Sequence, residues 1–298
     1  MALYACIDIG SNTTRLLVAE PGEGVLREAM AQRAFTRLGK GLRRDAAIPA
    51  DKLEEIAQVV ATQVRLAREL GAERLRTVAT AAIRRARNRD ELCAAVSDRA
   101  HVDVEILDGD EEARLAFVGA TRMLGHEVDG EVAVADVGGG SSELALGTVR
   151  GGVRWSASFR VGSGFLADAY LRSDPPSIDE LNAVRQHAAG AFEGVDVPVP
   201  ALAVAVGGSA TSLRRLVGAE LSHETLERGV RVLASAPVAE VARRFELDPQ
   251  RVRLLPAGIL VLEAICDRLG RPLQIGRGGL REGVILEMIG ETPARSRA

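Results

Sequence analysis

The sequence VAVADVGGGSSELALG, from Val132 to Gly147, decides the fold. Its four leading apolar residues reach Asp136, a turn rich in glycine and serine follows, and an alternating apolar run resumes after Glu143. This pattern predicts a strand, a tight turn and a second strand. Because glycine lets a ligand approach the backbone closely, the N–H groups of such a turn can bind an anion, and the two carboxylates suit Mg²⁺. An ordinary hairpin with a glycine turn explains this stretch equally well.

A second copy of the pattern lies near the N-terminus, where Tyr4 to Ala19 reads YACIDIGSNTTRLLVA. A shift of 128 positions without a gap sets Asp8 on Asp136, Gly10 on Gly138, Thr14 on Ser142 and Arg15 on Glu143. A strand, turn and strand that occur twice predict two similar domains.

Length and composition restrict the class of protein. A chain of 298 residues accommodates two domains, and 47% hydrophobic with 27% charged residues is typical of a soluble globular protein. No apolar run approaches the roughly 18 residues of a membrane span, and the N-terminus does not resemble a signal peptide. A net charge of −3 gives no general attraction for nucleic acid. We therefore expect a cytoplasmic protein without nucleic-acid or membrane partners, and a homodimer is left open.

Cysteine and histidine do not form a recognisable metal or disulfide pattern. Cys6, Cys93 and Cys266 are odd in number and scattered, so each is expected to be a small buried hydrophobe. The four histidines are isolated and are expected to be surface or packing residues.

Hydrophobic periodicity predicts alternating strands and helices in both halves of the chain. The expected strands are 3–9, 14–20, 24–33, 76–80, 104–107, 131–137, 142–147, 152–161, 202–206 and 272–275. The expected helices are 51–70, 90–97, 110–124, 162–171, 178–192, 210–216, 223–235, 237–246, 258–269 and 280–289. Three strands followed by strand and helix alternation is the order of a ribonuclease H-like domain. The tail from Glu291 is expected to be disordered.

Seven ordered segments carry a family resemblance. They are DIGSNTTRLLV (8–18), RLGKGL (37–42), ATAAIRRARN (79–88), GDEEARLAFVG (109–119), DVGGGSSEL (136–144), VGGSATSL (206–213) and GGLREGVI (278–285). The chain resembles the exopolyphosphatase and guanosine pentaphosphate phosphohydrolase family, within the actin, sugar kinase and Hsp70 superfamily. The resemblance implies an α/β fold of two ribonuclease H-like domains around an interdomain cleft. Domain I is expected at 1–118 plus about 283–298, and domain II at 119–282.

The resemblance implies a catalytic base. In this family the second glutamate of the EEARL segment activates the attacking water, and Glu112 holds that place. Such a base must come within hydrogen-bond reach of the water. Taken from the residues alone, Glu111 and Glu112 could simply complement a helix N-terminus.

Acidic residues at the two turns are the expected metal ligands. Asp136 and Glu143 are predicted to bind Mg²⁺, with Asp8 as a further acidic group. A carboxylate about 4 Å from a phosphate oxygen is repelled by roughly 4 kcal/mol per charge pair at an effective dielectric of 20, so a polyanion needs a cation there. Alternatively, Asp8 and Asp136 only fix their turns by accepting hydrogen bonds from nearby N–H groups.

Phosphate binding is expected from one arginine and three turns. The resemblance places a phosphate-binding arginine at Arg84, with Asn88 following it, and a guanidinium fork suits phosphate oxygens. Backbone N–H donors are expected from Gly10, Ser11, Asn12, Gly138, Gly139, Gly140, Ser141, Gly207, Gly208 and Ser209.

This sequence departs from the family pattern at two points, which limits how far residue roles known in the family can be assigned to it. Gly162 to Asp168 reads GSGFLAD, so Phe165 replaces an arginine that is common in relatives. Longer family members also continue into a helical HD-type domain, which this sequence does not show, and we therefore expect a preference for short polyphosphate.

The sequence thus predicts a Mg²⁺-dependent phosphoanhydride hydrolase that releases terminal phosphate from inorganic polyphosphate. Guanosine pentaphosphate is the alternative substrate. A kinase of the same superfamily and a non-catalytic alarmone or nucleotide sensor are the rival functions.

Overall fold

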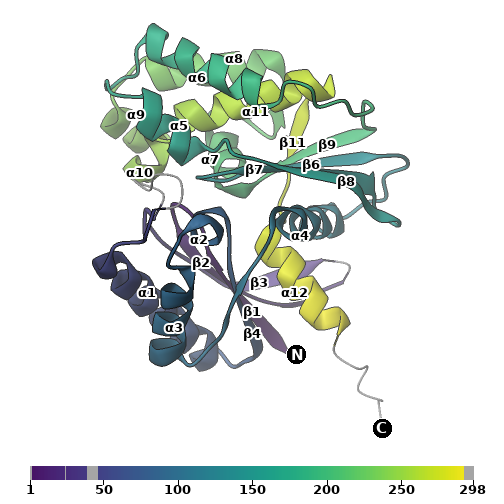
Figure 1. The fold of residues 1–298 in the computed structure, drawn as a ribbon. Coiled ribbons are helices and arrows are strands. Elements are labelled where there is room, and N and C mark those ends of the chain that lie inside the picture. Colours follow the sequence, from purple (N-terminus) through teal and green to yellow (C-terminus); the bar gives the residue numbers. More distant parts are fainter. Residues whose placement is uncertain (1, 24, 39–45, 292–298) are drawn as a thin grey trace. The chain divides into compact units, whose positions relative to one another are not determined.

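The computed structural model describes residues 2–23, 25–38 and 46–291 (Figure 1). The chain divides into two compact units, Met1–Gly125 with Gly278–Ala298, and His126–Arg277. These bounds differ by a few residues from the predicted domains, and all of helix α4 (Gly109–Arg122) falls in the first unit. The predicted disordered tail beyond residue 291 and positions 39–42 of the RLGKGL segment lie outside the described residues.

The first unit is a five-stranded sheet, in the described residues, with helices on both faces. Its sheet order is β3-β2-β1-β4-β5, in which β1 is antiparallel to β2 and parallel to β4. The elements are β1 (Leu3–Ile9), β2 (Thr14–Pro21), β3 (Leu26–Ala34), α1 (Ala50–Glu69), β4 (Ala72–Ala79), α2 (Ala81–Arg85), α3 (Arg89–Ala100), β5 (Val104–Ile106), α4 and α12 (Leu280–Gly290).

Strand β1 explains why both faces of this sheet are covered. Successive side chains of a strand point to opposite faces. Ala5 and Ile7 pack in the core cluster that includes α1 and α3, whereas Tyr4 and Cys6 pack in the cluster that includes α4 and α12. Asp8 has the same parity as Tyr4 and Cys6, so its carboxylate lies on the α4 face of the sheet.

The second unit repeats this topology. Its described sheet has the order β10-β11-β9-β6-β7-β8, so an antiparallel meander again leads to parallel neighbours. The elements are β6 (Val132–Val137), β7 (Ser142–Thr148), β8 (Gly152–Phe159), α5 (Ser163–Tyr170), α6 (Ile178–Ala191), β9 (Leu202–Val206), α7 (Gly207–Val217), β10 (Glu220–Leu221), α8 (His223–Ala234), α9 (Val238–Arg244), α10 (Pro249–Val252), α11 (Leu255–Leu269) and β11 (Leu273–Ile275). The predicted fold of two similar α/β domains is therefore confirmed.

Several predicted element boundaries were wrong. The residues 207–209, expected to be a loop, form the first turn of α7, because packing overrides the low helix propensity of two glycines. Helix α11 begins at Leu255 rather than 258, since a proline is tolerated in the first turn. The short elements α2, α10 and β10 were not predicted, and β4 begins at Ala72 rather than 76.

Glycines bring α4 and α12 into backbone contact in the first unit. A Cβ placed on Gly283 would lie 2.0 Å from the carbonyl oxygen of Leu115, and one on Gly119 would lie 1.9 Å from that of Gly279. Larger residues cannot occupy either position without a shift of the backbone. The two helices, seen side by side in Figure 1, therefore meet at a fixed distance.

The described helices have no membrane-spanning character: none is both long and apolar enough to cross a lipid bilayer. The cytoplasmic location stays a prediction.

Candidate functional site

The two repeat-related turns have the same backbone hydrogen bond. In the first unit Gly10 donates its N–H to the carbonyl of Thr13 at 3.0 Å, and in the second Gly138 donates to Ser141 at 3.0 Å. A Cβ on Gly10 would approach the closing carbonyl to 3.1 Å, and one on Gly138 would approach it to 3.0 Å. The turns predicted from the sequence repeat are thus the same structure built twice.

The turn of the second unit keeps backbone donors that the protein itself does not use. The carbonyls of Gly138 and Gly139 accept N–H groups from the first turn of α5, at 2.9 Å from Ser163 and 2.9 Å from Phe165. Among the described residues, no recorded hydrogen bond uses the N–H groups of positions 139–141. Three successive donors in one turn can bind an anion.

The turn of the first unit contains buried polar atoms without partners. Within the described part of the chain, Asn12 Nδ2 and Asp8 Oδ1 have no hydrogen-bond partner. The carbonyl of Asn12 accepts the N–H of Arg37 at 3.0 Å, which connects the turn to the start of the RLGKGL segment. Because native proteins rarely leave buried polar atoms unpaired, these two atoms fit a turn that binds a polar ligand.

The two turns differ in the charge that faces the aspartate. Asp8, only 2% exposed, lies opposite Arg15 on β2 and forms an ion pair with it at 3.0 Å. The corresponding pair in the second unit is Asp136 opposite Glu143. Like charges directly opposite one another in a sheet are destabilising. The second turn is therefore the one whose charges favour a cation.

The start of α7 lies against this acid pair. Gly207 has a left-handed φ of +83°, and a Cβ there would lie 2.2 Å from Asp136 Oδ1. The carboxylate is therefore close to the positive end of the helix dipole. The hydroxyl of Glu143's neighbour on β8, Ser158, donates to Glu143 Oε1 at 2.8 Å.

The other two predicted donors of α7 have different surroundings. A Cβ on Gly208 would lie 2.8 Å from the guanidinium of buried Arg251. Ser209 is itself buried, next to Gly258 of α11. Arg251, on the short helix α10, was missed in the sequence, and no local signal distinguishes it from the neighbouring Arg253.

Glu112 lies against Arg84 within the first unit. Glu112 is 7% exposed in the first turn of α4, and its Oε2 accepts a hydrogen bond from Arg84 Nη1 at 3.0 Å. The same nitrogen donates to the carbonyl of Leu107 at 2.6 Å, which fixes Arg84 on α2. The helix start is capped by Asp108, whose Oδ1 accepts the N–H of Glu111 at 2.8 Å. The guanidinium stabilises the negative charge of the buried carboxylate.

Asn88 has a structural position. It occupies the N-cap position of α3, but its side chain binds Ile48 instead: Oδ1 accepts the N–H of Ile48 at 2.7 Å and Nδ2 donates to the carbonyl of the same residue at 3.1 Å. It therefore holds the segment before α1 in place.

The predicted metal ligands do not form a larger cluster. No group of three or more His, Cys, Asp or Glu side chains suited to a metal ion occurs in the described ranges.

Cys6 and Cys266 are buried, and Cys93 is half-buried. Burial raises the pKa of the Cys266 thiol to about 11, so it stays protonated at neutral pH.

The opposite charge patterns of the two turns give a stability prediction. Arg15→Gln should lower the free energy of unfolding by about 1–3 kcal/mol, because it leaves the buried charge of Asp8 uncompensated, although the 25% exposure of the Arg15 side chain moderates the loss. Glu143→Gln should destabilise less than Arg15→Gln, because the glutamine amide oxygen can still accept the hydrogen bond from Ser158 and a repulsion between two facing carboxylates is removed. Urea unfolding without Mg²⁺ measures both variants.

A double variant, Asp8→Asn with Arg15→Gln, is the control and should recover most of the loss. Equal destabilisation by Arg15→Gln and Glu143→Gln would contradict the assignment of opposite roles to the two positions.

Comparisons with known proteins cover nearly the whole chain. The model of the Ppx/GppA phosphatase family matches residues 17–292. An uncharacterised protein of Streptomyces coelicolor is 31% identical over 97% of this chain and 90% of its own length. Exopolyphosphatase 2 of Mycobacterium tuberculosis is 27% identical over 96% of this chain and 98% of its own. The crystal structure of the Ppx/GppA family member from Aquifex aeolicus covers 98% of this chain and 99% of its own, with 29% identity and a TM-score of 0.81. The chain belongs to the Ppx/GppA phosphatase family and is a phosphoanhydride hydrolase.

Proposed function

We propose that the protein is an exopolyphosphatase that releases the terminal phosphate of inorganic polyphosphate by attack of water. The observation that carries this proposal is the contact between Glu112 and Arg84, which brings the predicted base within 3.0 Å of the predicted phosphate ligand. Relatives that are called exopolyphosphatases align with 95–96% of the chain.

Glu112 is proposed to act as the general base. A terminal phosphate bound by Arg84 would lie next to the Glu112 carboxylate, because the two side chains are already in contact. As the new bond from water oxygen to phosphorus forms, Glu112 accepts the proton of the water. The anhydride P–O bond breaks, and the shortened polyphosphate leaves with the electron pair. Correct placement of such a base contributes about 10²- to 10⁴-fold to the rate.

Arg84 is proposed to bind Glu112 in the free enzyme and the phosphate of the substrate during the reaction. Its recorded hydrogen bonds to Glu112 and Leu107 both come from Nη1, in the part of the chain that the structure describes. The remaining edge of the guanidinium can then bind phosphate oxygens as a fork. Arg84 thus balances the charge of Glu112 before substrate binds and the charge of the phosphoryl group during transfer.

The two glycine turns are proposed to bind phosphate oxygens through the backbone of their own units. Gly10, Ser11 and Asn12 offer this binding in the first unit, and positions 138–141 and 207–209 offer it in the second. Preformed N–H donors stabilise charge without reorganisation during the reaction.

The acid pair Asp136 and Glu143 fits Mg²⁺. Magnesium is commonly held by one or two carboxylates together with substrate phosphates, and Asp136 and Glu143 lie opposite each other on β6 and β7. When bound, the metal ion neutralises phosphate charge and so favours both binding and transfer. Asp8 is a weaker candidate ligand, because Arg15 already balances its charge.

Phosphate release from a panel of substrates tests the proposed function. Polyphosphates of graded length, guanosine pentaphosphate and ATP should be compared with Mg²⁺ and with a chelator, without any acceptor. We expect phosphate release from polyphosphate and loss of this release on chelation, because carboxylates close to the phosphate chain repel it when no cation is bound.

Other results of this panel would contradict the proposal in distinct ways. Release from guanosine pentaphosphate alone would assign the alternative substrate. Turnover only with an added acceptor would indicate a kinase. Tight binding without any release would indicate a sensor.

Removal of the proposed base gives a second prediction. Glu112→Gln keeps the shape of the side chain but cannot accept a proton, so kcat should fall about 10²- to 10⁴-fold. Asp110→Asn is the matched control, because it removes an exposed charge from the same helical turn, and its kcat should stay within about twofold. Equal rates for Glu112→Gln and Asp110→Asn would show that Glu112 is not the base.

A further inference from the structure

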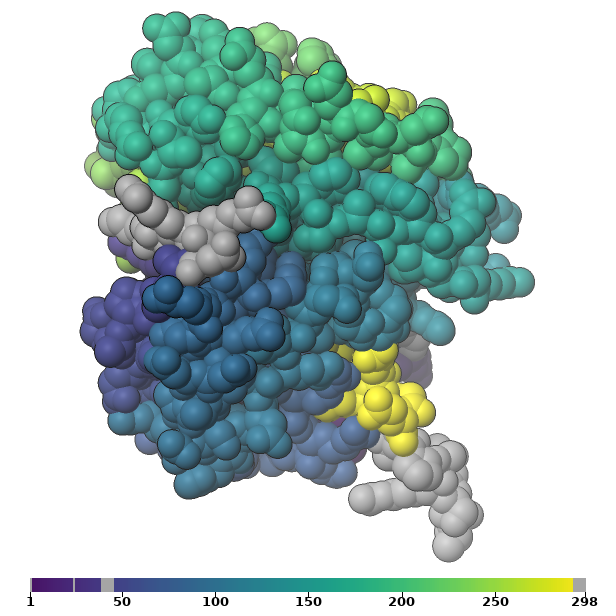
Figure 2. Space-filling model, in the orientation of Figure 1, coloured from purple at the N-terminus to yellow at the C-terminus, as the bar shows by residue number. Residues whose placement is uncertain are grey.

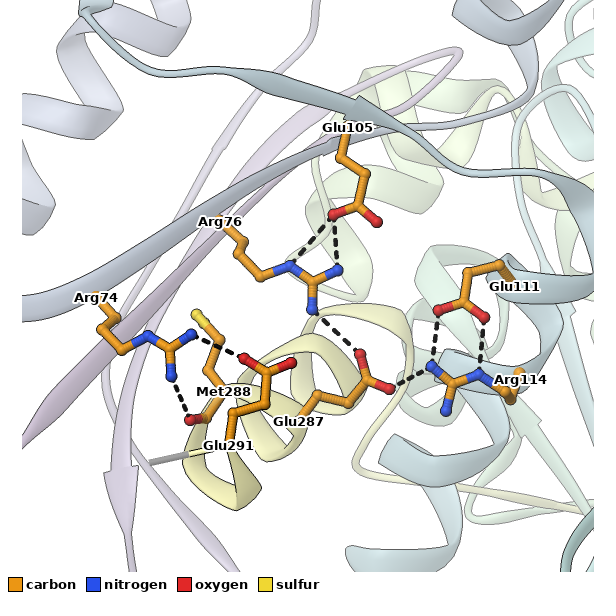
Figure 3. A network of polar contacts seen from close by, with 8 residues as sticks. All are labelled: Arg74, Arg76, Glu105, Glu111, Arg114, Glu287, Met288 and Glu291. Atoms are coloured by element: carbon orange, nitrogen blue, oxygen red, sulfur yellow. Dashed lines mark hydrogen bonds and ion pairs between the residues drawn. The ribbon is translucent and has the colours of Figure 1, made fainter. Parts of the chain in front are cut away.

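Arg114 connects two helices that are distant in the sequence (Figure 3). Its Nε and Nη2 each donate at 2.7 Å to one carboxylate oxygen of Glu111, one turn earlier on α4. Nη2 also bonds Glu287 on α12. The other carboxylate oxygen of Glu287 accepts a hydrogen bond from Arg76 of β4 at 3.1 Å. Arg76 also donates a hydrogen bond to Glu105 of β5 at 2.7 Å. The first turn of α4 is thereby linked to the C-terminal helix and to the sheet.

Helix α12 is a rigid anchor for this link. The glycine contacts at Gly119 and Gly283 fix its backbone against α4. Its apolar side is buried in the core under β1 and consists of Val284, Ile285 and Met288. Figure 2 shows other side chains of α12, in yellow, at the surface of the first unit. Glu287 lies at the border of these two regions, with 24% of its side chain exposed.

The linked turn is the one that carries Glu112. Neighbouring helical residues point about 100° apart, and the side chain of Glu111 is 33% exposed whereas that of Glu112 is 9% exposed. Arg114 therefore holds the turn from its outer side while Arg84 holds it from the inner side. The first turn of a helix is otherwise its least restrained part, because its N–H groups have no partners within the helix.

Stability alone does not account for this arrangement. Half-exposed ion pairs contribute about 0–1 kcal/mol each, and the buried face of α4 already holds the helix in the core. A guanidinium that binds a carboxylate through two parallel hydrogen bonds, as Arg114 binds Glu111, does, however, fix the relative orientation of the two side chains as well as their distance. Hydrogen bonds from Arg114 also lower the pKa of Glu111, which keeps this partner ionised at neutral pH.

We propose that Arg114 is a positioning residue that ties the first turn of α4 to Glu287 on α12 and so holds Glu112 in place beside Arg84. This inference rests on the proposed role of Glu112 as base. It assigns the C-terminal helix a part in catalysis through the position of Glu112.

The test compares Arg114→Gln with a matched variant on the same helix. Arg74→Gln removes an ion pair to Glu291, the residue that follows α12, and a hydrogen bond to the carbonyl of Met288 on α12, and neither of these bonds goes to α4. We expect Arg114→Gln to lower kcat roughly tenfold with KM nearly unchanged, because the base is misplaced while phosphate binding is kept. Arg74→Gln should leave both constants within about twofold. Arg114→Lys should restore part of kcat, because it keeps the charge but not the fork.

Two further measurements separate positioning from loss of structure. Glu287→Gln should lower kcat in the same direction, and the double variant with Arg114→Gln should be no slower than Arg114→Gln alone, since both act through one link. Amide hydrogen exchange should become faster at residues 109–113 in Arg114→Gln but not in Arg74→Gln.

Equal kcat values for Arg114→Gln and Arg74→Gln, or additive losses in the double variant, would overturn the proposal. If Arg114→Gln fails to fold, the milder Glu287→Gln decides alone, and unchanged kcat in that variant overturns it. Full activity of Glu112→Gln would instead refute the proposed function. An inactive Glu112→Gln beside a fully active Arg114→Gln would refute only the positioning role.

Discussion

The hydrogen bond that closes each glycine turn, from Gly10 to Thr13 and from Gly138 to Ser141, is the constraint on which the site depends. It folds the chain back directly after a buried strand, so the carbonyls turn inward to the protein. In the second unit the first turn of α5 occupies those carbonyls. The N–H groups that remain in the turn form the site that we propose for phosphate oxygens.

Divergence of the two copies explains how a duplicated turn serves two purposes. In the first unit Arg15 forms an ion pair with Asp8, so the charge of this carboxylate is balanced. In the second unit Glu143 takes the place of the arginine and lies opposite Asp136. This difference in charge is the reason that we propose the metal ion for the second turn rather than the first.

Much of the architecture could be predicted because local patterns in the sequence indicate the strands, helices and turns. Repeated apolar strands ending in Asp8 and Asp136 predict the two domains, and helical periodicity predicts most helices. The first turn of α7 was missed, because propensity argues against a helix that starts with Gly207 and Gly208 and only the surrounding packing overrides it. Arg251 was missed for a related reason, since its burial depends on contacts between distant segments.

The contacts between site residues could not be predicted, although the residues themselves were named. Glu112 and Arg84 were assigned from segments that a family resemblance made conspicuous, but their contact depends on how α2 and α4 meet in space. The link from Arg114 to Glu287 spans 173 positions in the sequence, and no local pattern indicates it. Sequence reasoning therefore identifies the chemical groups, and packing determines what each group acts on.

In the proposed reaction, water attacks the terminal phosphorus of a phosphate chain. Hydrolysis of polyphosphate in oxygen-18 water under single-turnover conditions, followed by mass spectrometry of the products, tests it most directly. Attack at the terminal phosphorus places one oxygen-18 atom in each released phosphate and none in the shortened chain. Heavy oxygen found in the shortened chain, or phosphate released without label, would contradict it.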